Sequence, residues 1–114
     1  MPFLNWSKNV WMVIHCMTLE YEINMLQNNH MTTENYDGLV IIIENLPQLM
    51  DCNKCKNKLI NYLKDNPPKD DISLFEWTVK VHNYVSSFLN KPAWTVEYAR
   101  EEYRKILYIP EYSS

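Results

Sequence analysis

The chain contains a single glycine, Gly38, among its 114 residues. Tight β-turns and phosphate-binding loops need backbone with positive φ, which glycine adopts at little cost. A chain with one glycine has few places for hairpins, and it lacks the glycine-rich fingerprints of nucleotide- and dinucleotide-binding folds. We therefore expect an all-α protein.

Five segments of the chain carry apolar residues at three- and four-residue intervals, which is the pattern of amphipathic helices. The predicted helices run from about residues 7 to 26, 34 to 46, 52 to 64, 72 to 90 and 95 to 107. Their lengths and the short connections between them predict a four-helix bundle plus a short fifth helix. At this length we expect one domain, spanning residues 1–114.

The ends of these helices carry recognisable signals. Pro47 and Pro92 end the second and fourth helices, because proline cannot continue a helix interior. We predict Asp51, Asp71 and Thr95 as the N-caps of the last three helices, since short oxygen-bearing side chains accept hydrogen bonds from the first turn.

The charge and hydropathy of the chain exclude several classes of protein. Fourteen acidic residues against eleven basic ones give a net charge of −3, without a basic stripe. Binding of nucleic acid by phosphate neutralisation is therefore disfavoured. The longest apolar runs, residues 10–17 and 39–43, are far shorter than the roughly 20 residues of a membrane span, and no signal-peptide cleavage site follows the first. We expect a soluble intracellular protein.

Three cysteines are present, and two of them, Cys52 and Cys55, form a CxxC motif; the third is Cys16. The small odd number argues against a secreted disulfide scaffold. Residues three apart on a helix are surface neighbours, within the Cα separation that a disulfide accepts. The positive end of the helix, with Lys54 and Lys56, would stabilise a thiolate.

This motif has three interpretations: a redox dithiol, half of a zinc site, or two buried cysteines without a special role. Zinc needs four nitrogen or sulfur ligands, whereas His15, His30 and His82 are far apart in the sequence. A thioredoxin fold would need a βαβ pattern around the motif, which is absent. A redox dithiol on a helical scaffold would need a bound electron acceptor.

Polar and aromatic residues gather at positions that a ligand could use. Trp11 and His15 share a face of the first predicted helix, and Trp94 follows the fourth. They are either bundle core or a flat slot suited to flavin and adenine rings. One edge of the fourth helix carries a polar row, which needs hydrogen-bonding partners if it is buried: His82, Asn83, Ser86 and Asn90.

Three elements, taken in order, resemble the Erv/ALR family of FAD-linked sulfhydryl oxidases. They are Trp11-Met12-Val13-Ile14-His15, then Cys52-x-x-Cys55, then His82-Asn83-x-Val85 with Leu89-x-Lys91-Pro92. The resemblance covers residues 6–103, and the last element is the most specific. The short length resembles the compact members encoded by large DNA viruses, for which the host cytoplasm would be the location.

The resemblance implies a helical bundle that holds FAD at its mouth, in most cases as a homodimer. It implies that Cys52 exchanges with a protein dithiol, that Cys55 lies beside the flavin, and that electrons pass through FAD to O2 to give H2O2. The FAD-site residues that it implies are Ser7, Lys8, Trp11, His15, His82, Asn83, Val85, Ser86, Leu89, Lys91, Trp94 and Tyr103.

The chain departs from the family pattern in four places. Ser7-Lys8 replace a usual Gly-Arg, Ser86 replaces a second Asn, and residues 48–51 resemble an insertion between Pro47 and the CxxC. No second cysteine pair is present, so the resemblance implies a thioredoxin-like or small CxxC relay protein as the immediate substrate. The alternatives are a non-enzymatic helical interaction module and a zinc-stapled helical domain.

Overall fold

The computed structural model describes residues 2–27 and 33–108 of the chain, with side chains from residues 8–26 and 34–108. Its elements are α1 (Pro2–Gln27), α2 (Thr33–Glu44), the 3₁₀ helix η1 (Leu46–Leu49), α3 (Asn53–Asp65), α4 (Leu74–Phe88) and α5 (Val96–Leu107). The described residues contain no strand, and the predicted all-α class is confirmed.

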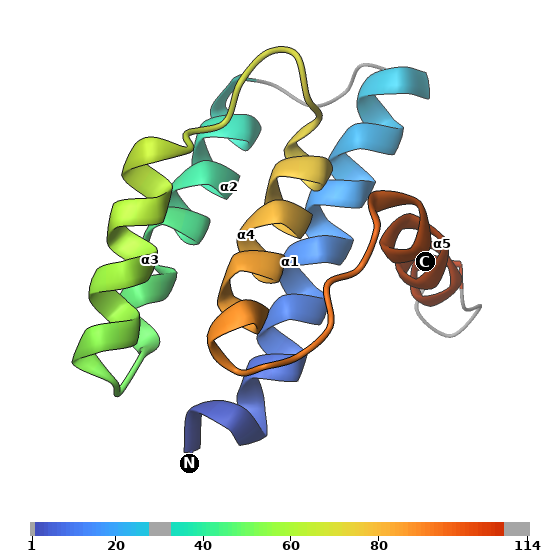
Figure 1. Ribbon diagram of the computed structural model, residues 1–114. Coiled ribbons are helices and arrows are strands. Elements are labelled where there is room, and N and C mark those ends of the chain that lie inside the picture. The colour runs from blue at the N-terminus through green and yellow to red at the C-terminus, as the bar shows by residue number, and fades with distance from the viewer. Residues whose placement is uncertain (1, 28–32, 109–114) are drawn as a thin grey trace.

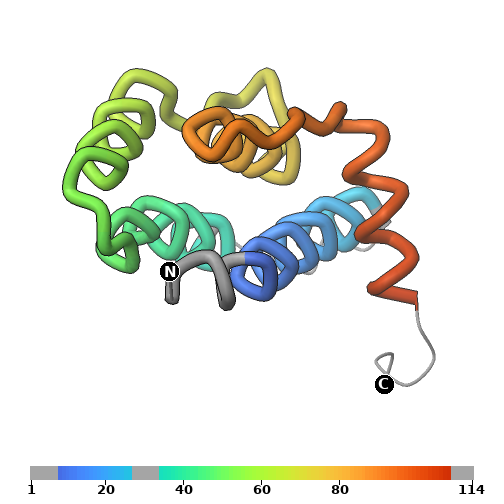
Figure 2. The backbone as a smooth tube through the Cα atoms, turned by 60° about the horizontal axis from the view of Figure 1, so that its bottom comes forward, coloured from blue at the N-terminus to red at the C-terminus, as the bar shows by residue number. Residues whose placement is uncertain are grey.

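The first four helices form a bundle that α5 crosses. α1 packs against α2, α4 and α5, while α3 packs against α4 and η1. Figure 1 shows α1 to α4 lying side by side, with α5 seen almost along its axis. Figure 2 shows α3 and α5 on opposite sides of the bundle. The predicted four-helix bundle with a short fifth helix is confirmed.

Two buried clusters hold the helices together, and α4 contributes to both. The first cluster joins the four bundle helices and η1: Trp11, Ile14, Ile43, Leu46, Leu59, Leu63, Leu74, Trp77, Val81 and Val85. The second joins α1, α4 and α5: Leu19, Phe75, Val79, Ala99 and Tyr103. Amphipathic spacing alone predicts one buried face for each helix, but α4 is buried on two sides because it lies between α3 and α1.

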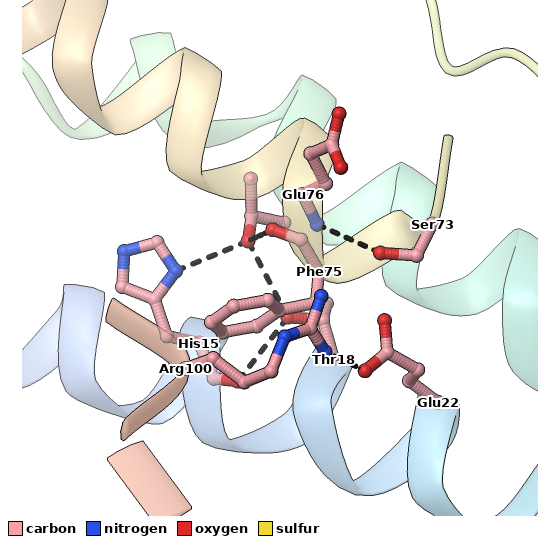
Figure 3. A network of polar contacts seen from close by, with 8 residues as sticks. His15, Thr18, Glu22, Ser73, Phe75, Glu76 and Arg100 are labelled. Atoms are coloured by element: carbon pink, nitrogen blue, oxygen red, sulfur yellow. Dashed lines mark hydrogen bonds and ion pairs between the residues drawn. The ribbon is translucent and has the colours of Figure 1, made fainter. Parts of the chain in front are cut away.

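The side chain of Arg100 covers one side of the second cluster. Arg100 on α5 forms an ion pair with Glu22 on α1, and its guanidinium lies 5.2 Å from the centroid of the Phe75 ring. Figure 3 shows Arg100 beside both residues. These contacts, together with the burial of Ala99 and Tyr103, fix α5 against α1 and α4.

The structure corrects several predicted helix ends. α1 begins at Pro2 instead of near residue 7, because proline is well suited to the first turn of a helix. Ser73, not Asp71, caps α4, and its hydroxyl accepts from the Glu76 N–H at 3.1 Å. The intervening Ile72 packs against the first cluster, which delays the helix start. Thr95 caps α5 as predicted.

Candidate active site

Three rings from α1 and α4 form a stack in the bundle. The Trp11 and His82 ring centroids are 4.1 Å apart with an interplanar angle of 5°. The His15 and His82 rings are 5.0 Å apart at 23°. Trp11 and His15 are buried, with exposed fractions of 6% and 1%. The structure thus brings together three residues that the sequence singled out from two separate helices.

A chain of hydrogen bonds runs through the two histidines and fixes their protons. The Thr78 hydroxyl donates to the Phe75 carbonyl at 2.7 Å, so its oxygen is left to accept from His15 Nδ1–H at 3.0 Å (Figure 3). A neutral His15 then accepts at Nε2, 2.8 Å from His82 Nδ1, which must carry a proton. His82 Nε2 therefore presents a lone pair as a hydrogen-bond acceptor.

Both imidazoles are neutral at pH 7. Burial, followed by the charge of His82, lowers the pKa of His15 to about 3. Burial, followed by the charge of Lys91, lowers the pKa of His82 to about 4. A neutral imidazole carries one ring proton, which is what the hydrogen bonds from Thr78 through His15 to His82 require of each histidine.

These lowered pKa values make the fold sensitive to acid. Between about pH 6.5 and 4 the unfolded chain binds protons at both histidines that the folded chain does not, so the free energy of unfolding falls as the pH falls. The expected loss is on the order of a few kcal/mol. In an NMR titration from about pH 8 to 5, the ring-proton shifts of His15 and His82 should stay constant. Titration of either ring near 6.5 would contradict the assignment.

The Thr78 hydroxyl is expected to set the tautomer of His15. Thr78→Val keeps the shape of the side chain but leaves the buried Nδ1 of His15 without a hydrogen-bond partner, at a cost of about 1–3 kcal/mol in unfolding free energy. The control Thr78→Ser keeps the hydroxyl. Ring ¹⁵N shifts should report the Nδ1–H tautomer of His15 in the parent and the serine variant, and its loss in the valine variant. An unchanged tautomer in Thr78→Val would show that the hydroxyl does not control it.

The turn after α4 returns the chain to this stack. Asn90 has φ 55, a left-handed conformation that asparagine tolerates, and Lys91 N–H reaches the Ser86 carbonyl at 3.0 Å. Together they end α4 in a Schellman-type cap. The Asn83 amide then accepts from the Trp94 N–H at 3.0 Å and donates to the Trp94 carbonyl at 2.9 Å. Asn83 thus positions Trp94.

Tyr103 on α5 closes the far side of the stack. Its ring lies 4.8 Å from that of His15 and 6.1 Å from that of Trp94. Burial, followed by the charge of Cys16, raises the pKa of Tyr103 to about 12, so the phenol stays neutral. Trp94 is more open, with 38% of its surface exposed.

The two cysteines of the CxxC motif open α3 as free thiols. Cys52, not the predicted Asp51, is the N-cap, and its Sγ accepts from the Cys55 backbone N–H at 3.2 Å. The hydrogen bonds from the thiol and the backbone N–H of Cys55 lower the pKa of Cys52. The thiol hydrogen bond and then burial raise the pKa of Cys55. Of the two thiols, Cys52 is therefore the more acidic.

The remaining site residues of the sequence prediction are more scattered. Val85 and Ser86 are buried on α4, Leu89 is half-buried, and Lys8 is exposed. The side chain of Ser7 lies outside the described residues. Sequence reasoning missed Thr78, although it precedes His82 by one helical turn and so lies on the same face of α4.

Comparison with known families decides where the chain belongs. The model of the Erv1/Alr family matches residues 8–104, which is most of the chain. The chain belongs to the Erv1/Alr family. This family is one of oxidoreductases, the FAD-linked sulfhydryl oxidases. Searches of curated proteins and of solved structures found no match to the chain.

The site of this Erv1/Alr member suits the cofactor of its family. The half-buried ring of His82, which stacks on the buried Trp11, and the exposed Trp94 offer flat surface for a flavin or adenine ring. His82 Nε2 offers an acceptor for a ring amine.

Among residues 2–27 and 33–108, no helix is long and apolar enough to cross a bilayer. Nor does this part of the chain gather three metal-ligating side chains.

Proposed function

We propose that the chain is an FAD-dependent thiol oxidase that forms disulfide bonds in protein substrates. The observation that carries the proposal is the dithiol at the start of α3. Cys52 has a lowered pKa and Cys55 a raised one, within one helical turn. A thiol with a lowered pKa at a helix start, beside a second thiol, is the arrangement that thiol–disulfide exchange uses.

The oxidised pair reacts by two exchanges. A substrate thiolate attacks Cys52 Sγ, which forms a mixed disulfide, breaks the Cys52–Cys55 bond and releases Cys55 as a thiolate. The second substrate thiolate attacks the substrate sulfur of the mixed disulfide, so the substrate disulfide forms and Cys52 leaves as a thiolate. Its lowered pKa makes it a good leaving group. The two electrons of the substrate are then held in the reduced pair.

Reoxidation of the pair needs an acceptor, and FAD, when bound, supplies two-electron chemistry and passes the electrons to O2 to give H2O2. The residues that would hold FAD are those that the sequence singled out around the ring stack, with Trp11 and His82 as the flat surface. Asn83 and Thr78 would act through other residues: Asn83 positions Trp94, and Thr78 fixes the proton of His15.

The immediate substrate is proposed to be a thioredoxin-like or small CxxC protein. The chain has one cysteine besides the pair, Cys16. That thiol is half-buried and packs on the second cluster, and burial, then the charge of Glu20, raises its pKa. Cys16 is thus a poor nucleophile for relaying electrons to Cys52.

The protein is also proposed to form a homodimer. Large apolar side chains remain exposed on α1 and α2: Met12, Val13, Ile41 and Ile42. Exposed apolar surface of this kind marks an interface. Sedimentation equilibrium should give twice the chain mass, and a monomer at micromolar concentration would remove this part of the proposal.

Oxygen consumption tests the proposed activity. The purified protein supplied with FAD and dithiothreitol should consume O2 and release H2O2 in equal amounts, one of each per disulfide formed. Added catalase should return half of the oxygen. A folded, FAD-supplied protein that consumes no oxygen above the rate of free FAD would overturn the proposed function.

A further inference from the structure

Basic residues outnumber acidic ones on the helix that the dithiol opens, in a chain that is negative overall. The net charge of the chain is −3, yet α3 (Asn53–Asp65) carries four lysines and one acidic residue. The lysines are Lys54, Lys56, Lys58 and Lys64. More than a third of the eleven cations of the chain therefore lie on the helix that the CxxC motif opens.

Two of these lysines are near neighbours of Cys55 on α3: Lys54 precedes it directly, and Lys58 follows it by three residues. Lys54 and Lys58 are exposed and one helical turn apart. The charge of Lys54 contributes to lowering the pKa of Cys52, and the charge of Lys58 acts in the same direction on Cys55. The Lys58 ammonium lies 5.4 Å from the centroid of the Phe88 ring at the end of α4. Both cations thus lie on the first two turns of α3, next to Cys55.

Among the described residues, neither lysine forms an ion pair with an acid. The ion pairs among the described residues are Lys80–Glu76, Arg100–Glu22 and Lys105–Glu102, on other helices. The exposed Asp51 directly precedes Cys52, but the lysines of α3 outnumber it and leave a net positive field where a substrate must approach. Such a field selects partners of opposite charge and raises their association rate, more than it raises final affinity.

We infer that the protein substrate carries its reactive cysteines in an acidic segment, which docks on the face of α3 formed by Lys54 and Lys58. The inference rests on the proposed function and names the substrate class of the same site. The acidic flanks of the substrate would pair with the two lysines, while its thiolate, also negative, is drawn toward Cys52. The exchange is the one described above and needs no further reactant.

The exchange step can be measured without flavin or oxygen. In a Cys16→Ser/Cys55→Ser background, Cys52 is the one remaining thiol and can be converted to a mixed disulfide with thionitrobenzoate. Release of the coloured thiol then reports attack on Cys52. The probes are two CxxC peptides, identical except for glutamate or lysine flanks, and uncharged dithiothreitol.

The comparison is between protein variants for one peptide at a time, because flanking charges also change the reactivity of a peptide's own thiol. Lys54→Glu/Lys58→Glu should slow the glutamate-flanked peptide about tenfold or more at low ionic strength and accelerate the lysine-flanked one. Both effects should shrink at about 1 M salt, where screening acts within about 3 Å. The matched control Lys80→Glu/Lys105→Glu makes the same charge change elsewhere and should alter neither rate.

Each result decides the inference. Equal slowing of both peptides by Lys54→Glu/Lys58→Glu, or no change in either, would overturn the acidic docking face. An equal effect of the Lys80→Glu/Lys105→Glu control would show that net charge, not this face, is responsible, and would overturn it as well. Oxygen consumption by the parent protein with dithiothreitol is measured in a separate assay. A failure there would contradict the oxidase proposal, whereas the exchange rates of the two peptides test the docking proposal alone.

Discussion

Cys55→Ser is expected to abolish dithiol oxidation while leaving the fold and FAD binding in place. The hydroxyl of serine cannot form the disulfide that a substrate thiolate must attack. Cys55 is half-buried at the first turn of α3, outside both buried clusters, so the unfolding free energy should change by less than about 1 kcal/mol. Oxygen uptake with dithiothreitol should fall to the rate of free FAD.

The matched control for this variant is Cys16→Ser. It removes the same atom from the same residue type on α1, where the thiol packs against the second cluster. The expected result is turnover within about twofold of the parent and a modest loss of stability. Substantial turnover in Cys55→Ser would contradict the proposed exchange at Cys52. A collapse of turnover in Cys16→Ser would show that this thiol takes part in electron transfer.

Trp11→Ala is expected to have the largest effect on both stability and cofactor binding. Trp11 is 6% exposed, belongs to the first cluster and stacks on His82. Truncation of a buried aromatic side chain to alanine costs about 3–5 kcal/mol. Urea unfolding of the parent and the variant would measure this loss. The loss of the flat ring should also weaken FAD binding, measured by quenching of flavin fluorescence.

Two further variants separate these effects. Trp11→Phe keeps an aromatic ring and should retain a folded protein with intermediate FAD affinity. Met12→Ala changes the neighbouring residue, which is 36% exposed, and should cost less than about 1 kcal/mol with FAD binding unchanged. If folded Trp11→Phe bound FAD as tightly as the parent, the tryptophan ring would not be part of the cofactor surface.

Helix content and bundle architecture could be predicted because the buried residues of each helix recur in the sequence at three- and four-residue spacing. The ends were harder to predict. At α3 and α4 several capping residues stand within three positions, and the choice among them depends on packing. Asp51 is intrinsically the better cap, yet the thiol of Cys52 takes that position. The second buried face of α4 was missed because it depends on which helices lie on either side.

The ring stack was partly predictable. Helical spacing placed Trp11 and His15 on one face of the first helix and His82 in the polar row of the fourth, which needs partners if it is buried. Their mutual stacking and the hydrogen bond between the imidazoles depend on how α1 and α4 are packed, over more than sixty residues of separation. Thr78 gave no signal of its own, because a threonine on a buried helix face is commonly satisfied by its own backbone.

The central claim is that this dithiol is coupled to a bound flavin, and the visible absorption spectrum of the purified protein tests it most directly. We expect a flavin band near roughly 450 nm that bleaches when dithiol is added without air and returns when air is admitted. A folded protein that stays colourless after incubation with FAD, or a bound flavin whose band dithiol leaves unchanged, would contradict the claim.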